Sequence, residues 1–368
     1  MVDPIIHLIT STRVGGAECA LERLLMCPEL KGKHLVVSMT PMGEVGQRLQ
    51  IAGVKVESLG MGSINKVGLG VMRWIGILRC YRPRLVVSWM YHANILALVS
   101  RYIGRRAPVV WNVRCDLSDY ARWPQMRKLI LGFSGRLSSG AERIIFNSYR
   151  SMSAHCQIRY PVDTSQVIYN GFDISLPSPS ERIRSREALG ISPSTFLVGG
   201  IGRNVPVKRM DRLLTICRML VQDGCPCELL LVGRGYDTEI FQKQIEAAGV
   251  ADRVHRVGEV RDVGPCMASL DILCICSDSE GFPNTAAEAA FRGIPVAAMD
   301  VGDLSVFLSP CQIGRSTSEL TEKLMAIYQL TQTERNQLIQ EQSIRYRTHT
   351  QLEKVVSQFN FLFEQQSL

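Results

Sequence analysis

The sequence predicts an α/β protein with two doubly wound parallel sheets whose domains face a cleft. Short apolar runs of strand length alternate with helical patterns, as in sheets covered by helices on both faces. The alternation stops once near the middle of the chain and then starts again. The 368 residues, 46% of them hydrophobic, suit two α/β domains better than one core.

The first half carries the strand patterns of one Rossmann-like domain. A loop over 11–16 follows the first apolar run, and a helix is expected over 17–26. Because strands and helices alternate, we expect the strands to pair in parallel. The predicted strands are Ile5–Ile9, 34–39, 54–59, Leu85–Trp89, Val109–Val113 and 144–147.

The pattern breaks around 167–179, where a strand over 167–173 is expected to run into a Ser- and Pro-rich linker. The second half then repeats the alternation, with a helix over Met210–Gln222 and an amphipathic helix over 351–363. We therefore predict a first Rossmann-like domain (1–172), a second Rossmann-like domain (173–345) and a C-terminal helix (346–368) that packs back toward the first domain. The later strands are expected at Phe196–Ile201, 228–232, 254–257, 272–276 and 296–298.

Charge and composition restrict the partners. The net charge of +8 fits an anionic ligand such as a diphosphate, or an anionic membrane, although a basic enzyme without a charged partner has the same composition. No aromatic and basic recognition motif predicts nucleic acid binding. We expect no signal peptide and no membrane span, buried reduced thiols among the 12 cysteines, and a cytoplasmic protein with at most peripheral contact with the inner membrane face.

The segment from Ser277 to Val296 carries the strongest functional signal. A buried strand leads into a loop with Glu280 and Gly281, and a helix follows that Asn284 or Thr285 could cap. A helix N-terminus offers free N–H groups and a partial positive charge, which suit a diphosphate. The two carboxylates, Glu280 and Glu288, could accept hydrogen bonds from sugar and ribose hydroxyls. The alternative is an ordinary strand–loop–helix unit with two surface glutamates.

Two further loops suit phosphate binding. Gly202 and Arg203 follow the first strand of the second half, and Lys208 lies five residues after Arg203. Such a pair could clamp a diphosphate and offset its charge as it leaves, although solvated loop cations would look the same. Gly15 and Gly16 form a weaker Gly-rich turn before a helix, and no dinucleotide-binding fingerprint can be completed there.

Together these residues resemble glycosyltransferase family 4, which has the two-domain GT-B fold. The resemblance covers nearly the whole chain and rests mainly on the Glu-x7-Glu element from Glu280 to Glu288. Gly202-Arg203 with Lys208 also matches the family pattern. So do the segments 231–235 and 167–171.

The resemblance implies that 1–172 is the acceptor-side domain and 173–345 the nucleotide-sugar-binding domain, and it implies a role for each motif. Arg203 and Lys208 would bind the donor diphosphate, and Glu288 the ribose hydroxyls. The loop at Val257 would face the base, and Gly15 and Gly16 would close over the phosphate. The donor sugar and phosphates would be held by Glu280 and the backbone of Gly281, Phe282, Pro283, Asn284 and Thr285. Family members are typically retaining and need no metal, so we expect no cofactor beyond the nucleotide sugar.

Two residues of the first domain are candidates near the reacting sugar. His92, after the fourth strand, resembles the family histidine that faces the donor sugar, and it could equally be a helix-start histidine that satisfies local backbone. Arg114, after the next strand, is a weaker candidate for acceptor binding.

Three features depart from the family pattern. Arg209 stands where the family often has Gly, which predicts a stiffer or more basic loop. Ala290 replaces a common Met, and the segment 302–313 looks shortened, which affects the far wall of the donor pocket.

The mechanism and the acceptor have alternatives. Retention could come from attack on the leaving-group face, with the phosphate oxygen as base, or from a covalent step through Glu280. A glycan or lipid-linked acceptor in cell-surface polysaccharide or lipopolysaccharide synthesis is expected. The segment 120–137, basic and containing Trp123, is either a membrane-surface helix or an ordinary packed helix. A GT-B-fold sugar-nucleotide epimerase and a non-catalytic nucleotide-sugar-binding partner are the competing functions.

Overall fold

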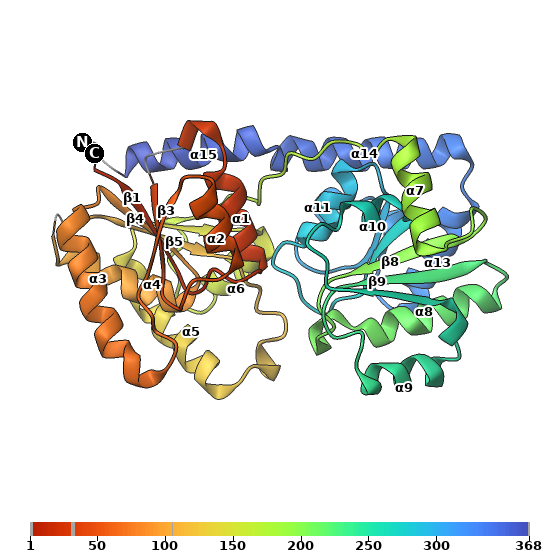
Figure 1. The fold of residues 1–368 in the computed structure, drawn as a ribbon, viewed down its shortest axis with the longest axis horizontal. Helices are drawn as coiled ribbons and strands as arrows, with labels where there is room; N and C mark the ends of the chain where they lie inside the picture. Colours follow the sequence, from red (N-terminus) through yellow and green to blue (C-terminus); the bar gives the residue numbers. More distant parts are fainter. Residues whose placement is uncertain (1–2, 31–33, 105, 367–368) are drawn as a thin grey trace. The chain divides into compact units, whose positions relative to one another are not determined.

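The computed structural model describes residues 3–30, 34–104 and 106–366. It divides into two compact units, and the chain passes from the first to the second between Gly171 and Phe172. It returns to the first unit at Thr350. The units are therefore 1–171 with 350–368, and 172–349, whereas the sequence placed the boundaries at 172/173 and 345/346. Figure 1 shows the elements of both units.

Unit 1 contains a parallel sheet in the order β3-β2-β1-β4-β5-β6-β7. Its central strands are buried along their whole length, because helices cover both faces. One face packs on α1, α2 and α15, and the other on α3, α4 and α5. The strands are β1 (Ile5–Ile9), β2 (His34–Ser38), β3 (Lys55–Ser58), β4 (Leu85–Trp89), β5 (Val109–Val113), β6 (Arg143–Phe146) and β7 (Ser165–Val167). The helices are α1 (Gly16–Leu25), α2 (Glu44–Ile51), α3 (Val67–Tyr81), α4 (Tyr91–Ala97), α5 (Gln125–Leu137), α6 (Tyr149–Cys156) and α15 (Leu352–Gln365).

Unit 2 contains a second parallel sheet in the order β10-β9-β8-β11-β12-β13. Helix α8 buries one face against β8 and β9, with the apolar spacing that the sequence predicted. The strands are β8 (Phe196–Ile201), β9 (Cys227–Val232), β10 (Val254–Gly258), β11 (Ile272–Ile275), β12 (Val296–Met299) and β13 (Ile313–Gly314). The helices are α7 (Pro179–Leu189), α8 (Met210–Gln222), α9 (Glu239–Ala248), α10 (Gly264–Ala268), α11 (Asn284–Phe291), α12 (Leu304–Phe307), α13 (Thr317–Gln329) and α14 (Gln332–Thr350).

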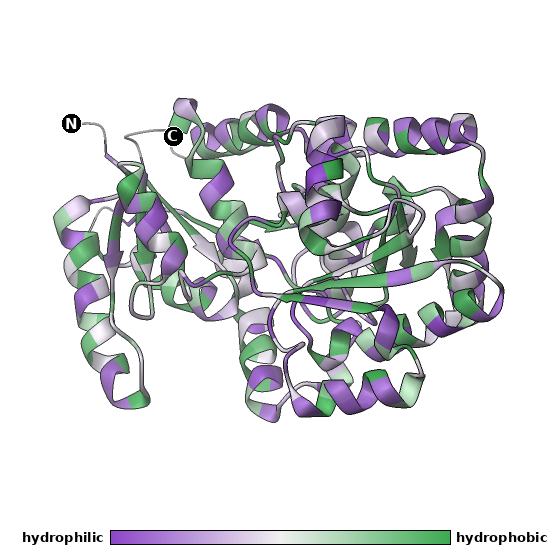
Figure 2. Ribbon diagram, turned by 45° about the vertical axis from the view of Figure 1, so that its right-hand side comes forward, coloured by the Kyte–Doolittle hydropathy of each residue, from purple (hydrophilic) through white to green (hydrophobic). Residues whose placement is uncertain are grey.

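The two doubly wound sheets confirm the predicted fold class, although a few elements differ from the prediction. The strand expected over 167–173 ends at Val167, and the chain then runs without regular structure. The predicted linker residue Ser178 instead caps α7, where its hydroxyl accepts a hydrogen bond from the Glu181 N–H. Helix α15 matches the predicted C-terminal helix, and its apolar face joins the core of unit 1. In Figure 2 hydrophilic and hydrophobic residues alternate along the surface helices.

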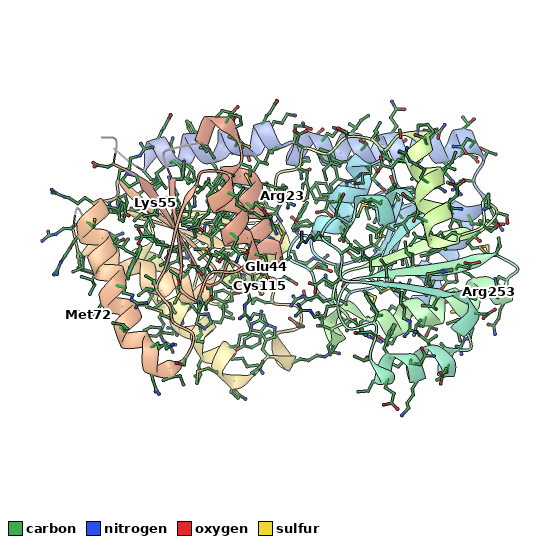
Figure 3. The ribbon with its side chains drawn as sticks, in the orientation of Figure 1. Arg23, Glu44, Lys55, Met72, Cys115 and Arg253 are labelled. Carbon is green, nitrogen blue, oxygen red and sulfur yellow. The ribbon has the colours of Figure 1, made fainter. Side chains whose placement is uncertain are left out.

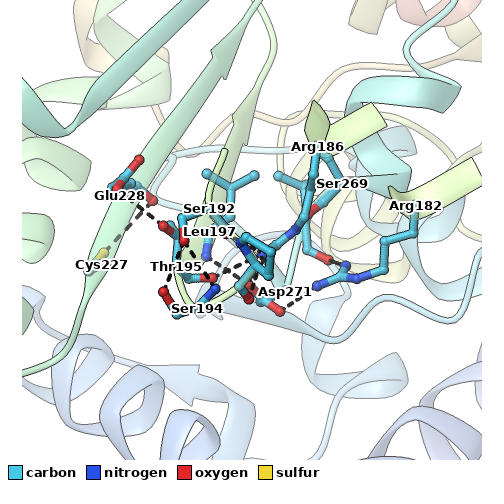
Figure 4. Close-up of polar contacts among 12 residues, drawn as sticks. Arg182, Arg186, Ser192, Ser194, Thr195, Leu197, Cys227, Glu228, Ser269 and Asp271 are labelled. Carbon is cyan, nitrogen blue, oxygen red and sulfur yellow. Dashed lines mark hydrogen bonds and ion pairs between the residues drawn. The ribbon is translucent and has the colours of Figure 1, made fainter. Parts of the chain in front are cut away.

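A charge cluster lies at the amino-terminal ends of strands β8 and β11, whereas the predicted site lies at their carboxyl ends (Figure 4). The Asp271 carboxylate pairs with Arg182 at 2.6 Å and with Arg186 at 2.5 Å, and it accepts the N–H of Leu197 at 2.7 Å. Arg186 is only 6% exposed, so Asp271 supplies the charge that a buried guanidinium requires. This cluster fixes α7 to the starts of β8 and β11.

No helix in the described part of the chain is both long enough and apolar enough to span a bilayer.

Candidate functional site

The site in unit 2 lies at the point where the strand order reverses. From β8 the chain proceeds outward to β9 and β10, and it returns to the other side of β8 at β11. The loops that follow β8 and β11 therefore leave the sheet at the carboxyl ends of adjacent strands, where open α/β sheets bind their ligands. Arg203 and Lys208 lie in the first of these loops, and Glu280 and the start of α11 lie in the second.

The two predicted motifs are in direct contact. Lys208 ends a short 3-10 turn, and its Nζ lies 2.5 Å from Oε1 of Glu280. The same carboxylate oxygen accepts a hydrogen bond from the Ser277 hydroxyl at 2.7 Å. Lys208 and Glu280 are both partly buried, with 29% and 11% of their side chains exposed. The ion pair therefore holds the loop after β8 against the loop after β11.

A second set of contacts, which the sequence did not predict, fixes the same two loops. Arg209 pairs with Asp211 at 2.8 Å and with Asp278 at 3.3 Å, and Arg212 reaches Asp278 at 2.9 Å. Asp278 also donates its N–H to the carbonyl of Val207 at 2.8 Å. The acidic partner lies far from the arginines in sequence, so only the fold brings them together.

The backbone of Arg209 explains why this position departs from the family pattern. Arg209 has φ +51° and ψ +51°, the left-handed conformation that glycine adopts most readily. A non-glycine residue there costs about 1 kcal/mol or more. The ion pairs of the Arg209 guanidinium offset part of that cost, so the predicted stiffer loop has a visible cause.

Arg203 is placed differently from Lys208. Its side chain is exposed, and within the described ranges it forms neither a hydrogen bond nor an ion pair. Its neighbour Asn204 anchors the loop. The Asn204 side-chain amide donates to the Gly235 carbonyl at 2.9 Å, and the Asn204 backbone N–H donates to the Arg234 carbonyl at 2.9 Å. A fixed loop that carries an unpaired guanidinium suits an anionic ligand.

The start of α11 differs from the predicted cap. Pro283, rather than Asn284 or Thr285, is the N-cap residue, and no side chain caps the helix. Proline provides no hydroxyl or carboxylate that could accept the first N–H groups, so this end of α11 keeps its partial positive charge available. Phe282 is 7% exposed, stacks on Phe172 and meets Phe307 edge to face, which anchors the loop in the core of unit 2. Glu288 lies one turn into α11 and is half-buried.

Glycines let neighbouring loops approach this site closely. Gly302 has φ +54°, and a Cβ there would lie 2.8 Å from the Glu280 carbonyl. Gly233 has φ +138°, and a Cβ there would lie 2.1 Å from the Gly202 carbonyl. The Gly233 N–H also donates to the Gly258 carbonyl at 2.7 Å, which places the loop after Val257 next to the other two. The segment 302–313, which looked shortened, contains the short helix α12.

In unit 1, Gly15, Gly16 and His92 lie at the switch point of the first sheet, between β1 and β4. Gly15 is the N-cap of α1 and Gly16 its first residue. His92 follows Met90, which has φ +72°, a strained value for a residue with a side chain. Partial burial lowers the pKa of His92, because the charged form of the ring loses part of its hydration. His92 therefore offers a neutral, exposed ring at this switch point, and its role stays a prediction.

Arg114, the weak candidate for acceptor binding, lies in a packed environment instead. Its Nη1 donates to the Asn170 side chain at 2.6 Å and to the Ile168 carbonyl at 3.2 Å. The guanidinium lies over the rings of Trp89 and Phe359, and burial lowers the pKa of Arg114 to about 9. These contacts favour a structural role for Arg114, in which it fixes the segment after β7.

The segment 120–137 is not one continuous amphipathic helix. Tyr120–Arg122 is a 3-10 turn, α5 begins at Gln125, and Trp123 is 5% exposed. The Trp123 indole N–H donates to Asp119 at 2.7 Å, and the Arg127 guanidinium covers its ring. Trp123 is therefore a core residue and cannot insert into a membrane. Cys115, marked in Figure 3, lies 3.1 Å from Arg127.

Within the described residues, no group of three or more His, Cys, Asp or Glu side chains is placed to bind a metal ion.

Comparisons with known proteins agree with this architecture. Residues 193–322 match the family model "Glycosyl transferases group 1". A D-inositol 3-phosphate glycosyltransferase of Segniliparus rotundus is 28% identical over 233 residues, which cover 61% of this chain and 48% of that protein. The lipopolysaccharide core biosynthesis mannosyltransferase LpsB of Rhizobium meliloti is 30% identical over 146 residues, 38% of this chain and 41% of that protein. The aligned regions thus span about half of these relatives or less.

The fold is shared over almost the full length with a solved structure. HepE of Anabaena, in complex with UDP-glucose, superposes with a TM-score of 0.86 at 22% identity, and the match covers 98% of this chain and 99% of HepE. The matched family segment contains both loops of the site in unit 2, with Arg203, Lys208, Glu280 and Glu288. Residues 193–322 are therefore similar to glycosyl transferases group 1, and the chain has the two-domain GT-B fold.

Proposed function

We propose that the protein is a retaining glycosyltransferase that moves a hexose from a UDP- or GDP-sugar to a hydroxyl of a glycan or lipid-linked acceptor. The observation that carries the proposal is the Lys208–Glu280 ion pair of 2.5 Å, which joins the loop carrying Arg203 to the loop that begins α11. This arrangement gathers cations and free helix N–H groups at one switch point, as a diphosphate requires. The match to glycosyl transferases over 193–322 supports the same reading.

In the proposed reaction the bond between the sugar and the diphosphate breaks first. The Arg203 guanidinium, the Lys208 ammonium group and the N-terminus of α11 then stabilise the negative charge that develops on the leaving diphosphate. These groups belong to the protein itself, so we propose that the reaction needs no metal ion. Glu288, one turn into α11, would accept hydrogen bonds from the ribose hydroxyls.

The contacts of Glu280 bear on how configuration would be retained. Its Oε1 already accepts hydrogen bonds from Lys208 and Ser277. A carboxylate whose charge is balanced by an ammonium group is a weaker nucleophile than an isolated one. We therefore favour attack of the acceptor on the leaving-group face, with the phosphate oxygen as base, and a positioning role for Glu280.

For the acceptor we propose a lipid-linked or glycan hydroxyl in cell-surface polysaccharide synthesis, at the inner face of the membrane. The lipopolysaccharide role of LpsB supports this class of acceptor. Helix α5 exposes Met126, Leu129 and Phe133 beside the exposed Arg136, a combination that suits an anionic membrane surface. Flotation with phosphatidylglycerol vesicles, and its loss in a Leu129→Ser and Phe133→Ser variant, would test the membrane contact.

Donor binding and turnover test the main proposal. We expect UDP or GDP, and one of their hexose conjugates, to raise the melting temperature, because a ligand of the native state stabilises it by mass action. The product, analysed by NMR, should keep the anomeric configuration of the donor, and turnover should persist in excess EDTA. Incubation with donor alone distinguishes an epimerase, which would change the sugar without an acceptor.

A matched pair of variants locates the donor site. Arg203→Ala should weaken nucleotide binding about tenfold or more, because a charge-assisted hydrogen bond is worth about 1.5–3 kcal/mol. Arg218→Ala is the control, since Arg218 is an exposed cation on α8. Equal affinities in the two variants would place the diphosphate elsewhere.

A further inference from the structure

A hollow in unit 1 lies between α5 and α6, apart from the switch point. Its volume is about 550 Å³, and it is lined by α5, α6 and the loop after β5. The switch point of this sheet lies between β1 and β4, whereas the hollow belongs to the β5 and β6 side. The role proposed for the switch points therefore does not account for it.

The rim of the hollow is positively charged. Arg136, Arg150 and Arg159 all line it and are exposed. Asp116 also lines it, but its carboxylate is buried and accepts the Ser118 N–H at 3.1 Å. In the described part of the chain, Arg136 donates only to the Gly132 carbonyl of its own helix, at 3.4 Å, and neither Arg136 nor Arg159 forms an ion pair.

The interior and one flank of the hollow are apolar. Leu131 and Ile158 line it, and Leu129 and Phe133 lie one turn from Gly132 and Arg136 on α5. Leu129 is 66% exposed and Phe133 is 52% exposed. Large apolar side chains next to Arg136 and Arg159 suit a ligand that has both an anionic group and an apolar segment.

The backbone at Arg159 is also unusual. Arg159 has φ +83°, a strained value for a residue with a side chain, and it follows the end of α6. The Ser138 hydroxyl donates a hydrogen bond to the Arg159 carbonyl at 3.2 Å, which fixes the turn. An arginine thus occupies a position that favours glycine, and it lines the hollow.

We propose that this hollow binds a phosphate ester with an apolar segment, and that it holds the acceptor substrate. The acceptor assignment rests on the proposed transferase function, whereas binding of the phosphate ester does not. Arginine is suited to this ligand because its planar fork can donate two hydrogen bonds to phosphate oxygens. The ligand could be a lipid headgroup or a soluble phosphate ester, and both present the same chemistry to the rim.

Calorimetric titration of the full chain with n-octyl phosphate tests the proposal. Saturable binding is expected, with weaker binding of inorganic phosphate and of neutral octyl glucoside, since each lacks one half of the recognised chemistry. Arg159→Gly removes the cation and also suits the left-handed backbone. Combined with Arg136→Ala, it should weaken n-octyl phosphate about tenfold or more.

A glycine inside the hollow allows it to be filled without harming the fold. A Cβ on Gly132 would meet only the Arg136 side chain, at 3.8 Å, and leucine has a higher helix propensity than glycine. Gly132→Leu should therefore abolish binding of n-octyl phosphate at an unchanged or higher melting temperature. Gly76→Leu is the control, because a Cβ on Gly76 of α3 meets nothing within 4 Å.

The outcomes separate this inference from the proposed function. Absence of saturable binding to the wild type, or equal binding to Gly132→Leu and Gly76→Leu, would overturn the site. If transfer to the acceptor is lost in Gly132→Leu while UDP or GDP binding and donor hydrolysis persist, the hollow serves the acceptor, whereas normal transfer in this variant would remove the acceptor assignment. If no nucleotide binds but n-octyl phosphate does, the proposed transferase function fails and the phosphate site stands. Phosphatidylglycerol vesicles that bind only when Gly132 is intact would identify the source as a lipid headgroup.

Discussion

The pH dependence of unit 1 should reveal one buried histidine. His155 on α6 is fully buried, and its Nε2 lies 2.7 Å from the Tyr91 hydroxyl. Its Nδ1 lies 2.7 Å from the Ser151 carbonyl, which can only accept, so Nδ1 carries the proton and Nε2 accepts from Tyr91. Protonation would place a charge in the core, and burial lowers the pKa of His155 to about 4.

The size and sign of the effect follow from that pKa. The unfolded chain binds the proton near the ordinary pKa of 6.5, and the folded chain only near 4. Stability is therefore complete above pH 6.5 and is lost as the pH falls toward 4. At about 1.4 kcal/mol per pKa unit, the full loss is about 3.5 kcal/mol. Burial also lowers the pKa of His7, which contributes in the same direction.

Tryptophan fluorescence can follow this loss in unit 1 alone. The protein has 4 tryptophans, and all of them (Trp74, Trp89, Trp111 and Trp123) lie in unit 1. Urea unfolding should show a free energy that falls between about pH 7.5 and 4.5, by about 2–3 kcal/mol more in the wild type than in His155→Gln. Gln cannot titrate, and His7 remains in the variant. The same pH dependence in both proteins would refute the reasoning.

The other predictions concern unit 2. Asp271→Asn should destabilise unit 2 by about 3–5 kcal/mol, because Arg186 would stay buried without a carboxylate; far-UV circular dichroism in urea measures this, and a loss below about 1 kcal/mol would contradict it. Lys208→Ala and Glu288→Ala should each lower transfer about 100-fold or more while the protein stays folded, and near-normal turnover in either variant would remove its residue from the site. Glu280→Gln should tighten UDP or GDP binding several-fold while it lowers turnover, as equilibrium titration and a transfer assay can show; unchanged affinity would disprove the charge competition at Lys208.

Most of the fold could be predicted from the sequence because its signals are local. Buried parallel strands are continuous apolar runs, and β1, β4, β5 and β8 have the bounds that their runs predicted. Helix α8 likewise follows its apolar spacing from Met210 to Gln222. The two-residue strand β13 was missed, because so short a segment carries no periodicity.

The details that were wrong or left open depend on neighbours that are distant in sequence. The sequence left open whether Trp123 belongs to a membrane-surface helix or to an ordinary packed helix, and a core cluster of unit 1 surrounds it. Asn284 or Thr285 was expected to cap α11, but Pro283 is the N-cap residue and the helix begins at Asn284, next to Phe282, which is buried among aromatic rings. The partner of Arg209 was unpredictable, since Asp278 lies 69 positions away.

The contact between Lys208 and Glu280 also changes how the diphosphate site must work. The sequence suggested two equivalent cations, but the charge of Lys208 is balanced by a carboxylate at 2.5 Å, whereas Arg203 has no ion-pair partner among the described residues. An incoming diphosphate would therefore gain most of its attraction from Arg203 and from the end of α11. Lys208 would gain in importance later, because the negative charge on the diphosphate grows as the sugar leaves and draws the ammonium group from Glu280. A cation that is balanced in the resting protein and released by the developing charge assists the transition state more than the ground state, which is what catalysis requires.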